Sequence, residues 1–228
     1  MSVVLALLWL AAVCAIALTR ARTGMPHAAA LASSPRGVAH GEVWTLLTSG
    51  LVIAGPPAPE LVGTALVVGG VLRALGGRRF WVVALSGHVG ATLMAYAGIA
   101  VLAGAGWRGV DGAIDAPDYG ISAVWTACLG ALVAAVVRRR GRLGLAPSGL
   151  AVAGLAVFVV IVGQSWDLAG VEHVLAFVLG AAVVVLGDAP GARHRGHARR
   201  RLRGPAPAGI LEAACGSWSS RTRSSWHR

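Results

Sequence analysis

Residues 119–137 read YGISAVWTACLGALVAAVV, an uninterrupted run without a charged side chain. A helix of about 20 apolar residues spans the hydrocarbon core of a bilayer. Five further stretches approach or exceed that length, at roughly 2–19, 59–76, 80–105, 148–165 and 171–187. Their apolar residues are continuous rather than alternating, which favours helices over the strands of a membrane barrel. We therefore expect an all-α polytopic membrane protein with six transmembrane helices.

Composition and charge support this interpretation. The 228 residues are 56% hydrophobic and 13% charged, and the mean hydropathy is +0.71, which is too apolar for a soluble domain of this length. All 20 basic residues are arginine. They gather between the second and third stretches, between the fourth and fifth, and after the sixth. The positive-inside rule then places both termini in the cytoplasm, so we expect a multi-pass protein of the cell membrane.

The chain divides into a membrane domain, residues 1–190, and a basic tail, residues 191–228. We expect the tail to be disordered and to lie against anionic lipid headgroups, and we do not expect nucleic-acid binding. No basic residue precedes the first stretch and no clear cleavage site follows it, so we expect a retained helix. The three cysteines, Cys14, Cys128 and Cys215, are widely spaced and predict neither a disulfide framework nor a metal site.

A serine and a histidine enter two of the apolar stretches at matching positions. Ser122 lies near the start of 119–137, and His173 near the start of 171–187. An ionisable residue inside a membrane is a functional-site hypothesis by default. A serine nucleophile needs a base to take its proton, and histidine suits that role. We therefore select Ser122 as nucleophile and His173 as general base, although either residue alone would more often be structural.

Small residues surround this pair. Gly120 would allow a close approach of backbone or substrate, while Ala123, Ala176 and Gly180 would let two helices pack tightly. The N–H of Ser122 falls in a first helical turn, where backbone donors are free and can stabilise an oxyanion. Asp118 is placed to cap that helix.

These motifs resemble those of the rhomboid family of intramembrane serine proteases. Gly120-Ile121-Ser122-Ala123 is similar to the family's Gly-x-Ser-Gly, and His173–Gly180 is similar to its His-x-x-Gly-x-x-x-Gly. Val43–Thr48 resembles its Trp-Arg loop signature, and Leu72–Arg79 resembles the turn after its second helix. The resemblance covers roughly residues 1–187. It implies a six-helix rhomboid-like bundle, a Ser122–His173 dyad and no metal or cofactor.

The chain also departs from the family. The helix-two His-x-x-x-Asn, which helps to hold the oxyanion, would fall near Pro56 and Glu60 and is missing. His88 and Thr92 have that spacing but lie in the third stretch, so the role is not transferred to them. Ala123 and Ala176 stand where the family has glycine. Losing one oxyanion donor costs about 10²–10³ in rate, so a slow enzyme remains compatible with these changes.

Three functions are consistent with the sequence. We expect a rhomboid-like protease that cleaves single-span membrane proteins near the outer membrane boundary. The alternative is a catalytically inactive relative that binds membrane clients. A small transporter or assembly subunit is a third possibility, opposed by the scarcity of charges in the middle of the apolar stretches.

Overall fold

The computed structural model describes residues 1–25, 27–53, 55–141 and 167–187. These residues are almost all helical and contain no strand, in agreement with the all-α prediction. Five helical runs among them are long and apolar enough to cross a membrane: Ser2–Thr23, Pro57–Leu75, Gly77–Gly104, Ile121–Arg139 and Leu168–Gly187. The expected fifth stretch, 148–165, and the basic tail, 191–228, lie outside the described residues.

Glycine and proline residues mark the ends of the first two long helices. Helix α1 (Ser2–Thr23) stops at Gly24, whose φ of 71° is the left-handed conformation of a helix C-terminus. Helix α5 (Pro57–Leu75) opens on proline, which suits a first turn because no N–H is needed there. Gly76, with φ 83°, then reverses the chain directly into α6. The tight turn explains how α5 and α6 follow each other without a connecting loop.

The third apolar run is one helix with an altered turn in its middle. Helix α6 (Gly77–Leu85) passes into the π-helical turn η2 (Ser86–Gly90) and continues as α7 (Ala91–Gly104). Such turns widen an α-helix locally and are frequent at functional sites. An added Cβ at Gly87 would lie 2.1 Å from the Ala127 Cβ, so η2 packs directly on α9.

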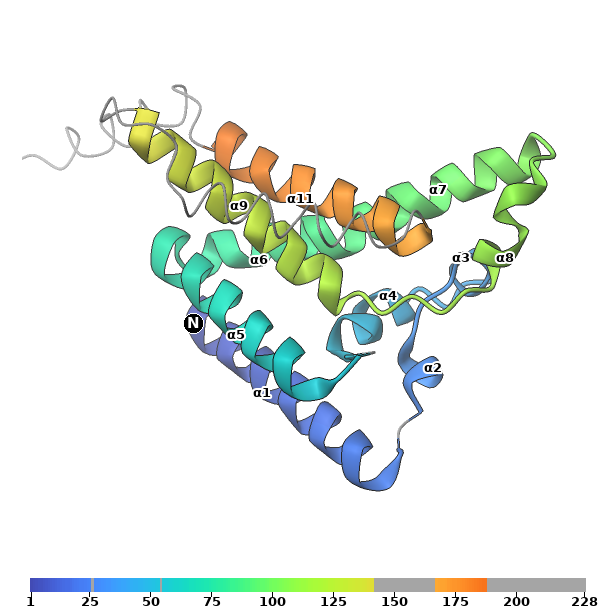
Figure 1. The fold of residues 1–228 in the computed structure, drawn as a ribbon, viewed down its shortest axis with the longest axis horizontal. Coiled ribbons are helices and arrows are strands. Elements are labelled where there is room, and N and C mark those ends of the chain that lie inside the picture. The colour runs from blue at the N-terminus through green and yellow to red at the C-terminus, as the bar shows by residue number, and fades with distance from the viewer. Residues whose placement is uncertain (26, 54, 142–166, 188–228) are drawn as a thin grey trace, which may run out of the picture. The chain divides into compact units, whose positions relative to one another are not determined.

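Helices α1 and α5 lie side by side, next to α6 (Figure 1). The contact of α1 with α6 contains three aromatic rings. Phe80 is completely buried, and its ring centroid lies 6.1 Å from that of Trp9 and 5.2 Å from that of Trp81. Trp81 Nε1 donates to the Ser2 carbonyl at 3.0 Å. This aromatic cluster fixes the start of α1 against the α5–α6 turn.

The segment between α1 and α5 forms short helices: α2 (Ala28–Leu31), α3 (Pro35–Ala39), α4 (Thr45–Thr48) and η1 (Ser49–Leu51). Trp44 is exposed, whereas Ser49 and Gly50 are buried against the bundle. Two more short helices, η3 (Arg108–Val110) and α8 (Asp111–Ile114), precede α9. A single antiparallel bridge, between Ser33 and Asp118, joins these two connecting segments.

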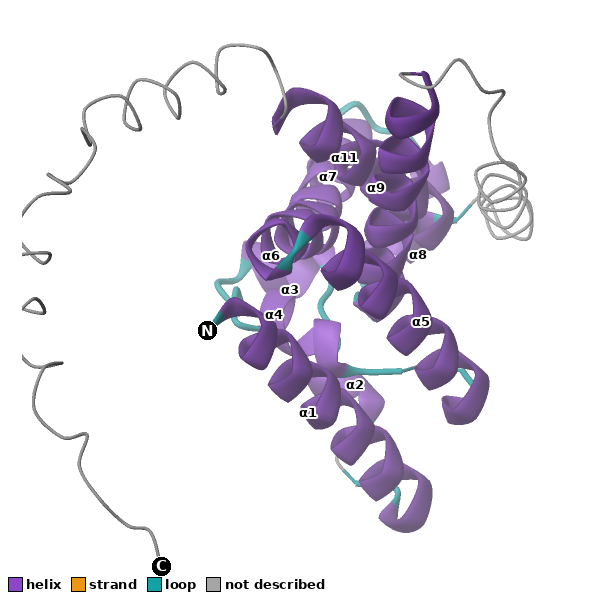
Figure 2. Ribbon diagram, turned by 90° about the vertical axis from the view of Figure 1, so that its left-hand side faces the viewer, coloured by secondary structure: helices purple, strands orange, loops and turns teal. Residues whose placement is uncertain are grey.

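Helices α9 (Ile121–Gly141) and α11 (Leu168–Gly187) form the most extensive contact in this part of the chain, beside α7 (Figure 2). Arg138 of α9 donates to the carbonyls of Val184 and Val185 at 2.9 and 2.7 Å. These carbonyls belong to the last turn of α11, which has no intrahelical donors for them. The C-terminal ends of α9 and α11 therefore lie together, and the helices run parallel.

Candidate functional site

The backbones of α9 and α11 touch at a crossing made by two glycines. An added Cβ at Gly180 would lie 2.0 Å from the Ala127 carbonyl oxygen, and one at Gly130 would lie 2.1 Å from that of Phe177. A Cα–Cβ bond tilts towards the helix N-terminus. A Cβ added to either glycine would therefore touch a residue of the partner helix that lies slightly closer to the N-terminal ends than the glycine itself. Residue 127 is therefore level with 177 and residue 130 with 180, an offset of 50 in both cases (177 − 127 and 180 − 130).

This offset brings the two predicted catalytic residues to one level. Ser122 is level with residue 172 (122 + 50), so Ser122 and His173 differ by about 1.5 Å along the helix axes. His173 precedes Phe177 by four positions and Gly180 by seven, which places it on the face of α11 that meets α9. The same spacing places Ala123 on the facing side of α9, directly after Ser122. Both predicted residues are half-buried.

The Ser122 hydroxyl is hydrogen-bonded within its own chain segment. Its Oγ donates to the Tyr119 carbonyl at 3.3 Å, and Thr126 Oγ1 donates to the Ser122 carbonyl at 2.6 Å. Among the hydrogen bonds of the described residues, none joins Ser122 to His173. The crossing thus brings Ser122 and His173 to one level along α9 and α11, Ala123 rather than Ser122 lies on the side of α9 that faces α11, and the serine hydroxyl is engaged locally.

The small residues predicted around the pair are all in close contacts. Ala123 and Ala176 are completely buried, and Gly180 touches the α9 backbone, as described above. Gly120 contacts a side chain that the sequence prediction did not include. A Cβ at residue 120 would lie 1.7 Å from Cε1 and 2.0 Å from Nδ1 of His88. The space beside Gly120 is therefore filled by an imidazole.

His88 is buried between two connecting segments. Its ring lies between Gly120 and Gly50, where an added Cβ would be 2.9 Å from Nε2. Nε2 is 3.4 Å from Ser49 Oγ, while Nδ1 has no hydrogen-bond partner among the described residues. The sequence signal for this site was a histidine between the glycines 87 and 90. The rhomboid family places its histidine on another helix, so the resemblance does not indicate His88.

Asp118 accepts hydrogen bonds from two buried hydroxyls. Its Oδ2 lies 3.1 Å from Tyr96 Oη and 3.5 Å from Ser33 Oγ, and its backbone exchanges two hydrogen bonds with Ser33. The side-chain hydrogen bonds of Asp118 therefore lead to α7 and to the first connecting segment. The prediction that this carboxylate caps α9 is therefore wrong, because no described hydrogen bond joins it to an N–H of α9.

Glu172 adds a second buried carboxyl next to Asp118. Thr92 Oγ1 of α7 donates to Glu172 Oε1, and the Glu172 carboxyl also interacts with that of Asp118. Glu172 is 2% exposed and Asp118 is 7% exposed. Glu172 thus points towards α7.

One exposed ion pair connects the segment between α1 and α5 to the segment between α7 and α9. Arg36 of α3 donates from Nε and Nη2 to the two carboxylate oxygens of Asp115. The hydrogen bond from Arg36 lowers the pKa of Asp115 below its ordinary value, assisted by the attraction between the charges. The same contact raises the pKa of Arg36. Both side chains are more than half exposed, so this pair contributes little to stability.

The described part of the chain contains no group of three or more His, Cys, Asp and Glu side chains that could hold a metal ion. No family model matches the chain, and no curated protein or solved structure matches it either. Functional assignment therefore depends on the site itself.

Proposed function

We propose that this protein is a rhomboid-like intramembrane serine protease of the cell membrane, with six membrane-spanning helices and both termini in the cytoplasm. Ser122 would be the nucleophile and His173 the general base, acting on single-span membrane proteins. One observation supports the proposal. The close contact of α9 and α11 at Gly130 and Gly180 implies that Ser122 and His173 lie at nearly the same position along the two helix axes. Apo structures often hold catalytic groups slightly apart, so the absence of a direct hydrogen bond is compatible with catalysis.

The chemistry would proceed from the half-buried serine. A change of the Ser122 χ1 rotamer would release its hydroxyl from the Tyr119 carbonyl. His173 would then accept the Oγ proton as Oγ attacks the substrate carbonyl, and would later return it to the leaving amine. The developing oxyanion would be stabilised by N–H groups of the first turn of α9, which have no intrahelical acceptor.

A catalytically inactive client-binding protein is the second candidate. The observation that favours it is the hydrogen bond from Ser122 Oγ to the Tyr119 carbonyl, because a structural serine in a membrane helix makes such a bond. The two candidates differ in whether Ser122 is reactive.

Labelling with a fluorophosphonate probe tests the proposal. The full-length protein in lipid nanodiscs should be labelled, and Ser122→Ala should abolish the labelling. His173→Ala should slow it about 10²-fold or more, because a general base contributes that much. Ser86→Ala is the matched control, since Ser86 Oγ also bonds to carbonyls of its own helix. Absence of labelling in folded wild type, or labelling that survives Ser122→Ala, would reject the protease and support the client-binding protein.

A further inference from the structure

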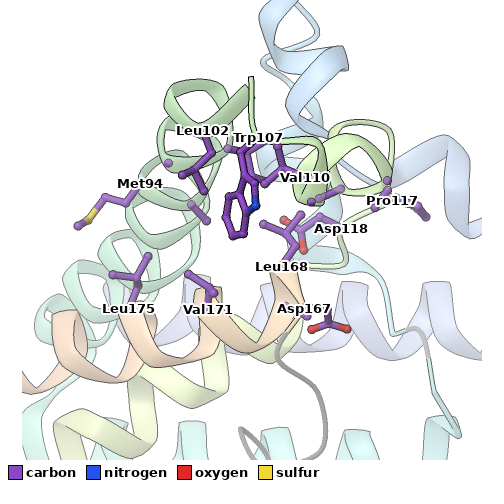
Figure 3. Close-up of a pocket in the computed structure, with 18 residues that line it drawn as sticks. Met94, Leu102, Trp107, Val110, Pro117, Asp118, Asp167, Leu168, Val171 and Leu175 are labelled. Carbon is purple, nitrogen blue, oxygen red and sulfur yellow. The ribbon is translucent and has the colours of Figure 1, made fainter. Parts of the chain in front are cut away.

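A cavity of about 660 Å³ lies beside α11, and neither Ser122 nor His173 is among its lining residues. Its walls come from α7, from the segment that contains η3 and α8, and from the N-terminal turns of α11 (Figure 3). Ligand pockets commonly have volumes of about 300–1,000 Å³. Val171 and Leu175 line this cavity, whereas His173 lies on the face towards α9. The cavity is therefore distinct from the proposed catalytic site.

The lining is apolar with acidic groups at one side. Leu102 of α7 lies across the cavity from Leu168 and Val171 of α11, and the indole of Trp107 forms part of the wall (Figure 3). Two of the 18 lining residues are charged, Asp118 and Asp167, and neither a basic side chain nor a histidine is among the 18. This composition fits a ligand with a hydrocarbon portion and a positive charge.

No arginine pairs with Asp118 among the described residues, and the basic side chains that interact with its charge are the histidines His88 and His173. Its hydrogen-bond donors, Tyr96 and Ser33, are neutral hydroxyls, and its close neighbour Glu172 is another carboxyl. The ion pair found within the described residues joins Arg36 to Asp115 instead. A buried carboxylate is costly unless a positive charge balances it. A cation in the cavity would offset that cost.

Trp107 indicates how the positive group would be held. Its indole is 58% exposed and lies at the cavity near Asp118 (Figure 3). The face of an indole attracts ammonium groups, most strongly quaternary ones. Asp167, which caps α11 through a 3.0 Å hydrogen bond from the Gly170 N–H, adds negative charge at the start of α11. Tryptophan is also typical of the headgroup level of a membrane, so the polar end of a lipid-like molecule would reach this depth.

We propose that this cavity binds an alkylammonium amphiphile, with its hydrocarbon chain between α7 and α11 and its ammonium group between Asp118, Asp167 and Trp107. The ammonium can belong to a lipid headgroup or to a free amphiphilic amine, because the same contacts serve both. The site requires no activity of Ser122 and does not depend on the proposed protease function.

Calorimetric titration of the full-length protein with hexyltrimethylammonium tests this assignment. The protein is placed in nanodiscs of phosphatidylglycerol, a lipid without an amine, and the heat from empty nanodiscs is subtracted. Saturable binding is expected, with affinity at least about tenfold weaker for hexanol and for hexyl sulfate, because the carboxylates contact only a cation. Equal binding of hexyl sulfate and hexyltrimethylammonium would overturn the proposal.

Two variants locate the binding site. Asp167→Asn should weaken binding about tenfold, while Asp115→Asn, which removes an exposed carboxylate outside the cavity, should not. Gly98→Leu should abolish binding, because Gly98 lines the cavity and an added Cβ there has open space. Gly63→Leu on α5, also with open space, is the matched control for folding. Unchanged binding in both Asp167→Asn and Gly98→Leu would overturn the assignment.

A change of lipid separates the two sources of the ammonium group. In nanodiscs of phosphatidylcholine the trimethylammonium headgroup would compete, so weaker apparent affinity for hexyltrimethylammonium would identify a lipid ligand. Unchanged affinity would identify a free amine. Displacement of hexyltrimethylammonium by an apolar peptide with one flanking lysine, but not by lipid or amines, would assign the cavity to a membrane-protein segment and reject the proposal.

Discussion

The imidazole of His88 occupies the space that a Cβ at residue 120 would need. A methyl group at Gly120 would lie 1.7 Å from Cε1 of that ring, well inside van der Waals contact. Because Gly50 closes the opposite side of the ring, the imidazole has little room to move away. Residue 120, two positions before Ser122, must therefore be glycine, because the His88 ring leaves no space for a side chain there.

Gly120→Ala should lower the free energy of unfolding by about 1–3 kcal/mol, the usual cost of overpacking a buried site. Reversible unfolding in mixed micelles measures it. Gly63→Ala is the control, because a Cβ there meets nothing within 4 Å and alanine is the better helix residue. In a His88→Ala background the cost of Gly120→Ala should shrink, since the clashing ring is gone. Equal costs in the two backgrounds would show that His88 is not the obstacle.

Gly180→Ala should separate α9 from α11. The added methyl would lie 2.0 Å from the Ala127 carbonyl oxygen, and a backbone atom of a packed helix cannot turn aside as a side chain can. We expect a lower melting temperature in detergent and, under the proposed function, slower fluorophosphonate labelling of Ser122. Gly187→Ala, on the same helix with open space around it, should change neither. A Gly180→Ala protein that melts and labels like wild type would contradict the crossing.

Five of the six apolar stretches correspond to the long helices of the described residues, because length and hydropathy are local properties. Ser122 and His173 were selected in the same local way, since each lies near the start of its own stretch, and their catalytic role stays a prediction. Local patterns could not predict the hydrogen-bond partners of Asp118, because Ser33 precedes it by 85 positions and Tyr96 belongs to another helix. Its position just before α9 suggested that its carboxylate caps that helix. In the folded chain the carboxylate instead accepts hydrogen bonds from Tyr96 and Ser33, which are distant in sequence. The role of His88 likewise depends on three segments that meet only in the folded chain.

The Arg36–Asp115 pair predicts a small dependence on pH. The pKa of Asp115 is lowered in the folded protein, so any stabilisation by the pair is present at neutral pH. It is lost as the pH falls through that lowered pKa. In Arg36→Ala the Asp115 pKa should rise towards its ordinary value, which carboxyl-carbon NMR measures. Arg108→Ala, an exposed arginine of the neighbouring segment, should leave it unchanged. An unaltered Asp115 pKa in Arg36→Ala would mean that the pair does not form in solution.

The Tyr96–Asp118 contact predicts coupled effects on stability. Tyr96→Phe removes a donor from a buried carboxylate, which typically costs about 1–3 kcal/mol. Asp118→Asn keeps the shape but loses the charge, so the second change should cost less once the first is made. A double-mutant cycle should therefore give a coupling of at least about 0.5 kcal/mol. Tyr119→Phe, next to Asp118 in sequence, controls for loss of a tyrosine hydroxyl near this site.

The same cycle separates two roles of Asp118. If the carboxylate capped α9, Tyr96→Phe would be nearly neutral, and the two changes would add independently. If it holds α7 and the first connecting segment together, coupling should appear in both Tyr96→Phe and Ser33→Ala, because both hydroxyls contact the same Oδ2 atom. Coupling in both cycles would show that Asp118 joins α7 and the first connecting segment near the start of α9. Additivity in both cycles would show instead that its carboxylate caps α9.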